Sequence, residues 1–266
     1  DIRYFAPTAN RPQFDRLVFD FLQIPPPDGD FPETILSEFQ RCTERALRNS
    51  NVHIPGIAGS IGRQEIERVE EQLVLGKAVL LTGNAGTGKS GIGYFLAQNA
   101  QNKARSTVVL DARQAAHVQD QNDLRQFYSL KGSLPDAITR IGQWKGCTVI
   151  IDQMDNVIGT PASTVIVDFA IECMGQAGVD IVVISRKREG HEAKLLGKLV
   201  DAGFIELNCF QLDTGTSIEL LQALGIVEPS DELVQLGQNL LNLEIIAKIR
   251  SETPDFCLNG VTDEID

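Results

Sequence analysis

The feature that most constrains the fold is one glycine-rich segment, Gly83-Asn84-Ala85-Gly86-Thr87-Gly88-Lys89-Ser90, which fits the pattern G-x-x-x-x-G-K-[ST] at every position. The apolar run 78–82 before it predicts a buried strand, and residues 91–98 after it predict a helix. A loop of this composition between a strand and a helix is the context in which the pattern binds phosphate. We therefore expect a P-loop domain with a nucleoside triphosphate site.

The residue types of this segment explain that chemistry. Gly83, Gly86 and Gly88 let the backbone turn so that its N–H groups approach phosphate oxygens. The helix that opens at Gly88 adds the positive end of its dipole. Lys89 is then placed to hold the β- and γ-phosphates, and the Ser90 hydroxyl to bind Mg²⁺. The predicted nucleotide contacts are completed by Asn84, Ala85, Thr87 and Gly91.

A second segment, Cys-Thr-Val-Ile-Ile-Asp at 147–152, predicts an apolar strand that ends in a carboxylate. P-loop enzymes place an acid at this point to hold Mg²⁺ through water, so we predict Ser90 and Asp152 as the metal residues. Many strands end in Asp at a turn. The prediction therefore depends on the P-loop in the same chain.

The composition limits the class of protein. The chain has 266 residues, is 42% apolar and carries a formal net charge of −12. This length suffices for one nucleotide-binding core and a smaller unit. The acidic balance argues against broad binding to nucleic acid or anionic membranes, which depends on clustered Lys and Arg. Five scattered cysteines and the lack of a run of about 18 apolar residues predict a reduced, cytoplasmic protein without a membrane span.

The order of elements predicts three units. Residues 1–50 read as a helical adaptor that either packs on its neighbour or binds a partner, 51–210 as the nucleotide-binding domain, and 211–266 as a helical subdomain. Strands and helices alternate in the middle unit, which predicts an α/β fold with a doubly wound parallel sheet. The predicted helices include a helical region at 123–144. A strand candidate at 107–110 and the long spacing between Lys89 and Asp152 predict that this strand is inserted between the P-loop strand and the acid strand, the ASCE type.

Three further features are a Gly62-Arg63 entry box, the order Asp152-Gln153-Met154-Asp155, and a strand at 181–184 followed by Ser185-Arg186. Over about residues 57–249 they resemble the STAND class of signal-transduction NTPases, which includes the NACHT and NB-ARC switches. The resemblance implies that Arg63 lies against the base and sugar of ATP or ADP. It also implies that Arg186 reaches the γ-phosphate. The second acid, Asp155, either orients the attacking water or caps the following turn.

The chain departs from related patterns at two points. AAA+ ATPases carry a Glu directly after the metal acid as the base that activates water, whereas Gln153 stands here and cannot take a proton. Hydrolysis should therefore be slow. STAND helical domains usually contact the nucleotide through a Pro, and the counterpart segment 237–243 has none.

These features leave three functions open. The first is an ATP/ADP-dependent switch that hydrolyses slowly and controls homo-oligomerisation in immune, antiphage or cell-death signalling. By resemblance, protein effector and sensor modules would then belong to the same longer chain. The alternative is an AAA+ type ATPase that remodels or loads a macromolecular partner. The third is a scaffold that keeps nucleotide as a structural part.

Overall fold

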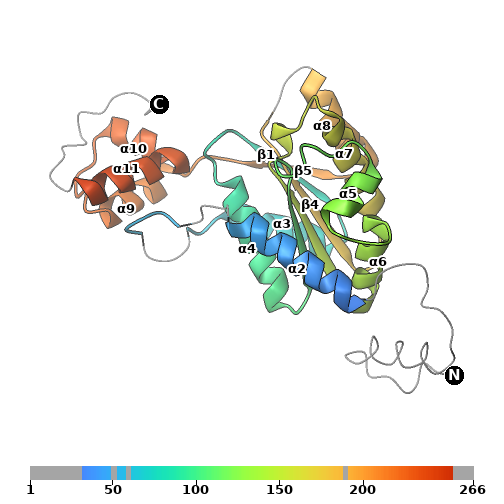
Figure 1. Cartoon of the computed structure of the whole chain (residues 1–266). Helices are drawn as coiled ribbons and strands as arrows, with labels where there is room; N and C mark the ends of the chain where they lie inside the picture. The colour runs from blue at the N-terminus through green and yellow to red at the C-terminus, as the bar shows by residue number, and fades with distance from the viewer. Residues whose placement is uncertain (1–31, 49–52, 58–60, 188–190, 254–266) are drawn as a thin grey trace, which may run out of the picture.

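The computed structural model describes residues 32–48, 53–57, 61–187 and 191–253, and its centre is a parallel sheet of five strands (Figure 1). The strands are β1 (Val79–Gly83), β2 (Ser106–Asp111), β3 (Cys147–Asp152), β4 (Val179–Ile184) and β5 (Ile205–Cys209). Their spatial order is β2-β3-β4-β1-β5. The predicted α/β fold class is confirmed. One strand is inserted between the P-loop strand and the acid strand, but it is β4, and the candidate at 107–110 forms the edge strand β2.

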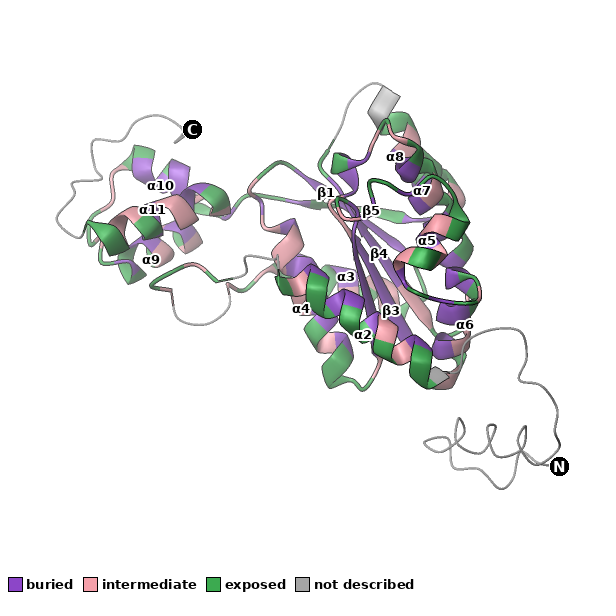
Figure 2. Ribbon diagram, in the orientation of Figure 1, coloured by how far each residue is buried: buried purple, intermediate pink, exposed green. Residues whose placement is uncertain are grey.

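Strands β1 to β4 are buried on both faces, as their apolar sequences require, whereas the edge strand β5 is mostly exposed. Successive residues of β3 alternate between two apolar clusters, with Val149 and Ile151 in one and Ile150 in the other. Strand β4 does the same. Figure 2 shows these strands as a continuous buried layer between half-exposed helices. The carboxyl ends of β1, β3 and β4 therefore lie at one edge, where parallel sheets bind ligands.

Helices cover both faces of the sheet. One face carries α3 (Gln64–Val74) and α4 (Lys89–Asn102), and the other carries α5 (Gln121–Phe127), α6 (Leu134–Lys145), α7 (Pro161–Cys173) and α8 (His191–Ala202). The prediction of one helical region over 123–144 was wrong. Ser129 has a positive φ of 54° and ends the first helix, and Ser133 caps the second by accepting from the Asp136 N–H.

Helix α2 (Pro32–Arg48) lies along β2, the edge strand of the sheet. Its Phe39 is 1% exposed and packs edge-on against Tyr128. The Thr43 hydroxyl donates to the Thr107 carbonyl at 3.0 Å and accepts from the Val109 N–H at 3.0 Å. The helix thus covers the open edge of the sheet. The first part of the predicted adaptor, residues 1–31, lies outside the described residues.

A second, smaller core follows β5. It is built by α9 (Thr214–Ala223), α10 (Asp231–Gly237) and α11 (Leu240–Glu252), around buried leucines that include Leu221, Leu233 and Leu243. These helices stand to one side of the sheet in Figure 1. Ile54, Ile57 and Ile61, from the segment before α3, pack against the same core. The chain therefore enters and leaves the sheet domain beside this helical subdomain. The predicted boundaries at 50/51 and 210/211 stay predictions.

No helix within the described ranges is long and apolar enough to cross a lipid bilayer.

The bridge between α2 and β2 gives a stability prediction. Thr43→Val keeps the shape of the side chain but leaves one buried N–H and one buried C=O without this partner, so we expect a loss of about 1–3 kcal/mol in the free energy of unfolding. Urea denaturation measures it. Thr43→Ser retains the hydroxyl and serves as the control. Equal stability of the valine variant and the wild type would show that α2 does not protect the sheet edge.

Candidate nucleotide-binding site

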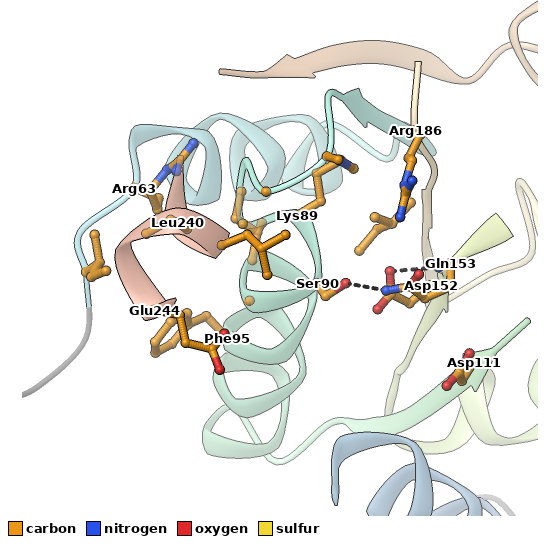
Figure 3. A pocket seen from close by; sticks show the side chains of 18 of the residues that line it. Arg63, Lys89, Ser90, Phe95, Asp111, Asp152, Gln153, Arg186, Leu240 and Glu244 are labelled. Atoms are coloured by element: carbon orange, nitrogen blue, oxygen red, sulfur yellow. Dashed lines mark hydrogen bonds between the residues drawn. The ribbon is translucent and has the colours of Figure 1, made fainter. Parts of the chain in front are cut away.

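A cavity of about 450 Å³ lies at the carboxyl ends of β1, β3 and β4. Figure 3 shows Lys89 and Ser90 on the first turn of α4, facing Asp152 and Arg186, with Leu240 of α11 on the other side. The cavity is therefore bounded by both the sheet domain and the helical subdomain. Its size is in the range of small-molecule and cofactor sites.

The P-loop curls around the start of α4. Gly86 and Gly88 have φ values of 73° and 86°, a region that residues with a Cβ rarely adopt. A Cβ at Gly83 would come within 2.5 Å of the Cys209 carbonyl oxygen, so the turn also has no space for a side chain there. The glycines predicted from the motif are thus required by backbone conformation and by close packing.

Lys89 is 8% exposed and its ammonium lies inside the loop. Its Nζ donates to the Gly83 carbonyl at 2.9 Å and to the Asn84 carbonyl at 2.6 Å. Burial lowers the pKa of Lys89 below its ordinary value. A cation held in this way by neutral carbonyls is a suitable partner for phosphate oxygens, which would supply the missing negative charge.

Ser90, Asp152 and Gln153 form the opposite side of the cavity. The Gln153 side chain donates to Ser90 Oγ at 3.0 Å, and its backbone N–H donates to Asp152 Oδ1 at 2.7 Å (Figure 3). Burial raises the pKa of Asp152 above its ordinary value, although its hydrogen bond with Ser90 opposes that shift. A hydroxyl beside a half-buried carboxylate is a donor set of hard oxygens that fits Mg²⁺.

Asp155 and Arg186 form a pair at the end of β4. Asp155 is in the short 3₁₀ turn η3 (Met154–Asn156), and its side chain is 4% exposed. One carboxylate oxygen accepts from the Arg186 backbone N–H at 3.2 Å, and the other lies 3.2 Å from Arg186 Nε. The Arg186 side chain is 51% exposed and borders the cavity. The carboxylate thus holds the end of β4, and the arginine keeps part of its guanidinium accessible.

Arg63 also borders the cavity, but its donors are occupied by protein acceptors. Nη1 donates to the Thr87 carbonyl at 2.9 Å, and Nη2 donates to the Phe210 carbonyl at 2.7 Å. Two further contacts join Nε and Nη2 to the Glu65 carboxylate at 3.1 and 2.8 Å. The guanidinium therefore ties the entry segment to the P-loop and to the end of β5. A contact with base or sugar stays a prediction from the resemblance.

Several residues at this site were not found from the sequence. Asp111 ends β2 in register with Asp152, borders the cavity, and binds the Arg113 guanidinium at 3.0 and 2.8 Å. The signal for Asp111 was the same strand-end rule that found Asp152. Asn239 and Leu240, at the start of α11, contact the P-loop directly. Both lie in segment 237–243, the counterpart of the segment that contacts the nucleotide in STAND proteins, but a contact with the P-loop was not predicted.

No protein-family model matches the chain, and no curated protein matches its sequence. Its structure is similar to the Walker-type ATPase paby2304 of Pyrococcus abyssi, with a TM-score of 0.53 and 16% identity over 77% of this chain and 72% of that one. It is similar to AMPPCP-bound DnaA from Aquifex aeolicus (TM-score 0.53, 15% identity, 77% and 66% covered) and to the Aeropyrum pernix ORC2 protein in ADPNP-ADP complexes (0.53, 10%, 79% and 66%).

At these identities the likeness establishes the fold. The chain has the ASCE-type fold of P-loop ATPases, with a helical subdomain after the sheet. Membership in the STAND class stays a prediction.

The raised pKa of Asp152 gives a prediction about stability. Because the folded chain holds this proton more tightly than the unfolded chain, the stabilising contribution is present at low pH and is lost as pH rises through the raised pKa. At neutral pH, Asp152→Asn should therefore raise the melting temperature of the ligand-free protein, by about 2–4 °C for a gain of about 1 kcal/mol.

The same variant should lose the extra stabilisation that Mg²⁺ gives on top of ADP. Thermal unfolding with ADP alone and with Mg²⁺ and ADP measures both effects. A variant that melts below the wild type without ligand and keeps the Mg²⁺ increment would contradict the assignment of Asp152.

Proposed function

We propose that this chain is a slow ATPase of the AAA+ kind, in which Mg²⁺ and ATP set the position of the helical subdomain and so control assembly with a macromolecular partner. Lys89 holds the β- and γ-phosphates, and Ser90 and Asp152 hold the Mg²⁺, which would neutralise phosphate charge when bound. The similarity to AMPPCP-bound DnaA and to ORC2 in ADPNP-ADP complexes supports ATP and ADP as the nucleotides.

The observation that carries the proposal is that one cavity is shared by two structural units. The Leu240 N–H, at the start of α11, donates to the Gly86 carbonyl of the P-loop at 2.8 Å. A nucleotide in the cavity would touch the sheet domain and the helical subdomain together. A ligand shifts a conformational equilibrium only through contacts that differ between the two states, and the γ-phosphate is the group that differs between ATP and ADP.

The proposed slow turnover follows from Gln153. This residue occupies the position after the metal acid and has a left-handed backbone with φ of 60°, and its amide donates to Ser90. A neutral amide can orient water but cannot accept its proton. ATP bound without a base at this position should persist long enough to act as a signal.

Arg186 is the proposed reader of the γ-phosphate. Its guanidinium is bound to the buried Asp155 and half exposed to the cavity, so a phosphate could attract it without a large backbone movement. Asp155 then acts mainly by holding the end of β4. Its second proposed role, orienting the attacking water, would need the carboxylate to leave Arg186.

Two candidate functions, an AAA+ type ATPase and a STAND switch, differ in the partner that the protein would bind. The fold neighbours favour an ATPase of the AAA+ kind that loads or remodels a macromolecule. The net charge of −12 favours a protein partner over broad contact with nucleic acid. A STAND switch in immune, antiphage or cell-death signalling is the second candidate, and the arginine at the end of β4 favours it. In both proposed functions the protein uses the same nucleotide site and forms homo-oligomers when ATP is bound.

Steady-state phosphate release tests the proposed enzyme. Lys89→Ala should weaken ATP binding at least tenfold and abolish turnover. Gln153→Glu should raise turnover about 10- to 100-fold, because a carboxylate then stands where a general base is needed. Gln143→Glu, on the exposed face of α6, is the matched control. Fast turnover by the wild type, with no gain from the glutamate at 153, would contradict the slow-switch mechanism.

Arg186→Gln tests the reader, since glutamine retains a donor for the buried Asp155. We expect the affinity for ATPγS to fall about tenfold while the affinity for ADP stays within about twofold, because the variant loses a charged bond to the γ-phosphate alone. Isothermal titration calorimetry measures both. Equal losses for the two nucleotides would rule out γ-phosphate sensing by Arg186.

A further inference from the structure

Three consecutive carbonyl groups of the P-loop are held from outside the loop. Asn239 Nδ2 donates to the Ala85 carbonyl at 3.2 Å, the Leu240 N–H to the Gly86 carbonyl at 2.8 Å, and Arg63 Nη1 to the Thr87 carbonyl at 2.9 Å. The donors come from two segments that flank the sheet domain. Arg63 precedes α3, and the other two begin α11.

These bonds fix the direction of three amide groups. In a trans peptide the C=O and the N–H of the next residue lie in one plane and point in opposite directions. The described residues contain no cis peptide bond. Carbonyls that point outward at Ala85, Gly86 and Thr87 therefore aim the N–H groups of Gly86, Thr87 and Gly88 toward the inside of the loop, where a phosphate would lie.

We infer that Asn239 and Arg63 are positioning residues of the phosphate cradle, which act on the nucleotide through the P-loop backbone. The inference rests on the proposed function, since it assigns these residues to the same nucleotide site. It gives Arg63 a role different from the base and sugar contact that the resemblance implies. It also gives the α10–α11 junction a role in phosphate binding, although segment 237–243 lacks the proline through which STAND helical domains contact the nucleotide.

The fit between the two segments and the loop is tight. A Cβ at Gly86 would lie 1.8 Å from Asn239 Oδ1, and one at Gly88 would lie 2.4 Å from Leu240 Cδ1. The P-loop glycines are therefore also needed for contact with the helical subdomain. Any movement of α11 would withdraw the donors of Asn239 and Leu240 together, whereas the Thr87 carbonyl would keep Arg63 and the Cys209 thiol, which donates to it at 3.2 Å.

Each positioning residue is itself held in place. Asn239 Oδ1 accepts from the Leu241 N–H at 3.0 Å and so caps α11, which ties the side chain to the helix. Arg63 and Glu65 form an ion pair with side chains 8% and 11% exposed, and the Phe210 N–H donates to Glu65 at 3.1 Å. The orientation of the cradle amides thus depends on the helical subdomain and on the connection that follows β5.

Asn239→Ser separates positioning from helix capping. Serine is also a good cap for α11, but it is too short to reach the Ala85 carbonyl. With the full chain, calorimetry would give the affinities for ADP and for inorganic tripolyphosphate. We expect both to weaken about fivefold, the usual effect of one lost hydrogen bond. The control is Ser230→Ala, which removes the cap of α10 away from the P-loop and should leave both affinities unchanged.

The variant Arg63→Lys tests whether Arg63 positions the P-loop amides or contacts the base of the nucleotide. Lysine keeps the charge but cannot hold Thr87, Phe210 and Glu65 at once. Equal losses of about tenfold for ADP and tripolyphosphate are expected. Weaker binding of ADP alone would assign Arg63 to the base or sugar and overturn its positioning role.

Unchanged binding by Asn239→Ser would overturn the role of Asn239. A wild type that binds neither ligand would instead refute the proposed function, and the inference with it.

Discussion

The structure depends on the backbone turn between β1 and α4. A phosphate can be bound there only if several N–H groups converge, and such a turn leaves its carbonyls pointing away from the ligand. Those carbonyls need donors of their own. The chain supplies them from the entry segment through Arg63 and from α11 through Asn239 and the Leu240 N–H. The arrangement of the two structural units around the P-loop can be understood from this requirement.

The pKa shifts of Lys89 and Asp152 also indicate a site that a charged ligand completes. Burial lowers the pKa of Lys89 and raises that of Asp152, so burial disfavours the charged form of each side chain. A phosphate beside the lysine and a cation beside the carboxylate would relieve both. Such a site favours Mg²⁺ and nucleotide together over either one alone. Strained or destabilised groups of this kind are expected where a ligand completes the structure.

Much of the fold could be predicted from the sequence because its signals are local. The P-loop pattern, each apolar strand and the carboxylate that ends the strand at 147–152 each lie within fewer than ten consecutive residues. The insertion of one strand was predicted, but the strand at 107–110 was expected there, and the structure places β4 between β1 and β3 instead. The break between α5 and α6 was missed although local signals for it exist, since Ser133 caps α6 and Pro135 stands in its first turn. The contacts of Arg63 with Phe210, and of Asn239 with Ala85, join residues about 150 positions apart, and only tertiary packing brings them together.

A crystal structure of the chain with Mg²⁺ and a non-hydrolysable ATP analogue would show directly whether the P-loop binds phosphate while its carbonyls are held from outside. The account predicts the triphosphate inside the turn 83–90, with Lys89 moved from the Gly83 and Asn84 carbonyls to phosphate oxygens and the metal between Ser90 and Asp152. It also predicts that Asn239, Leu240 and Arg63 still hold the loop from outside. A nucleotide bound elsewhere, or a loop that binds phosphate after α11 has left it, would contradict the account.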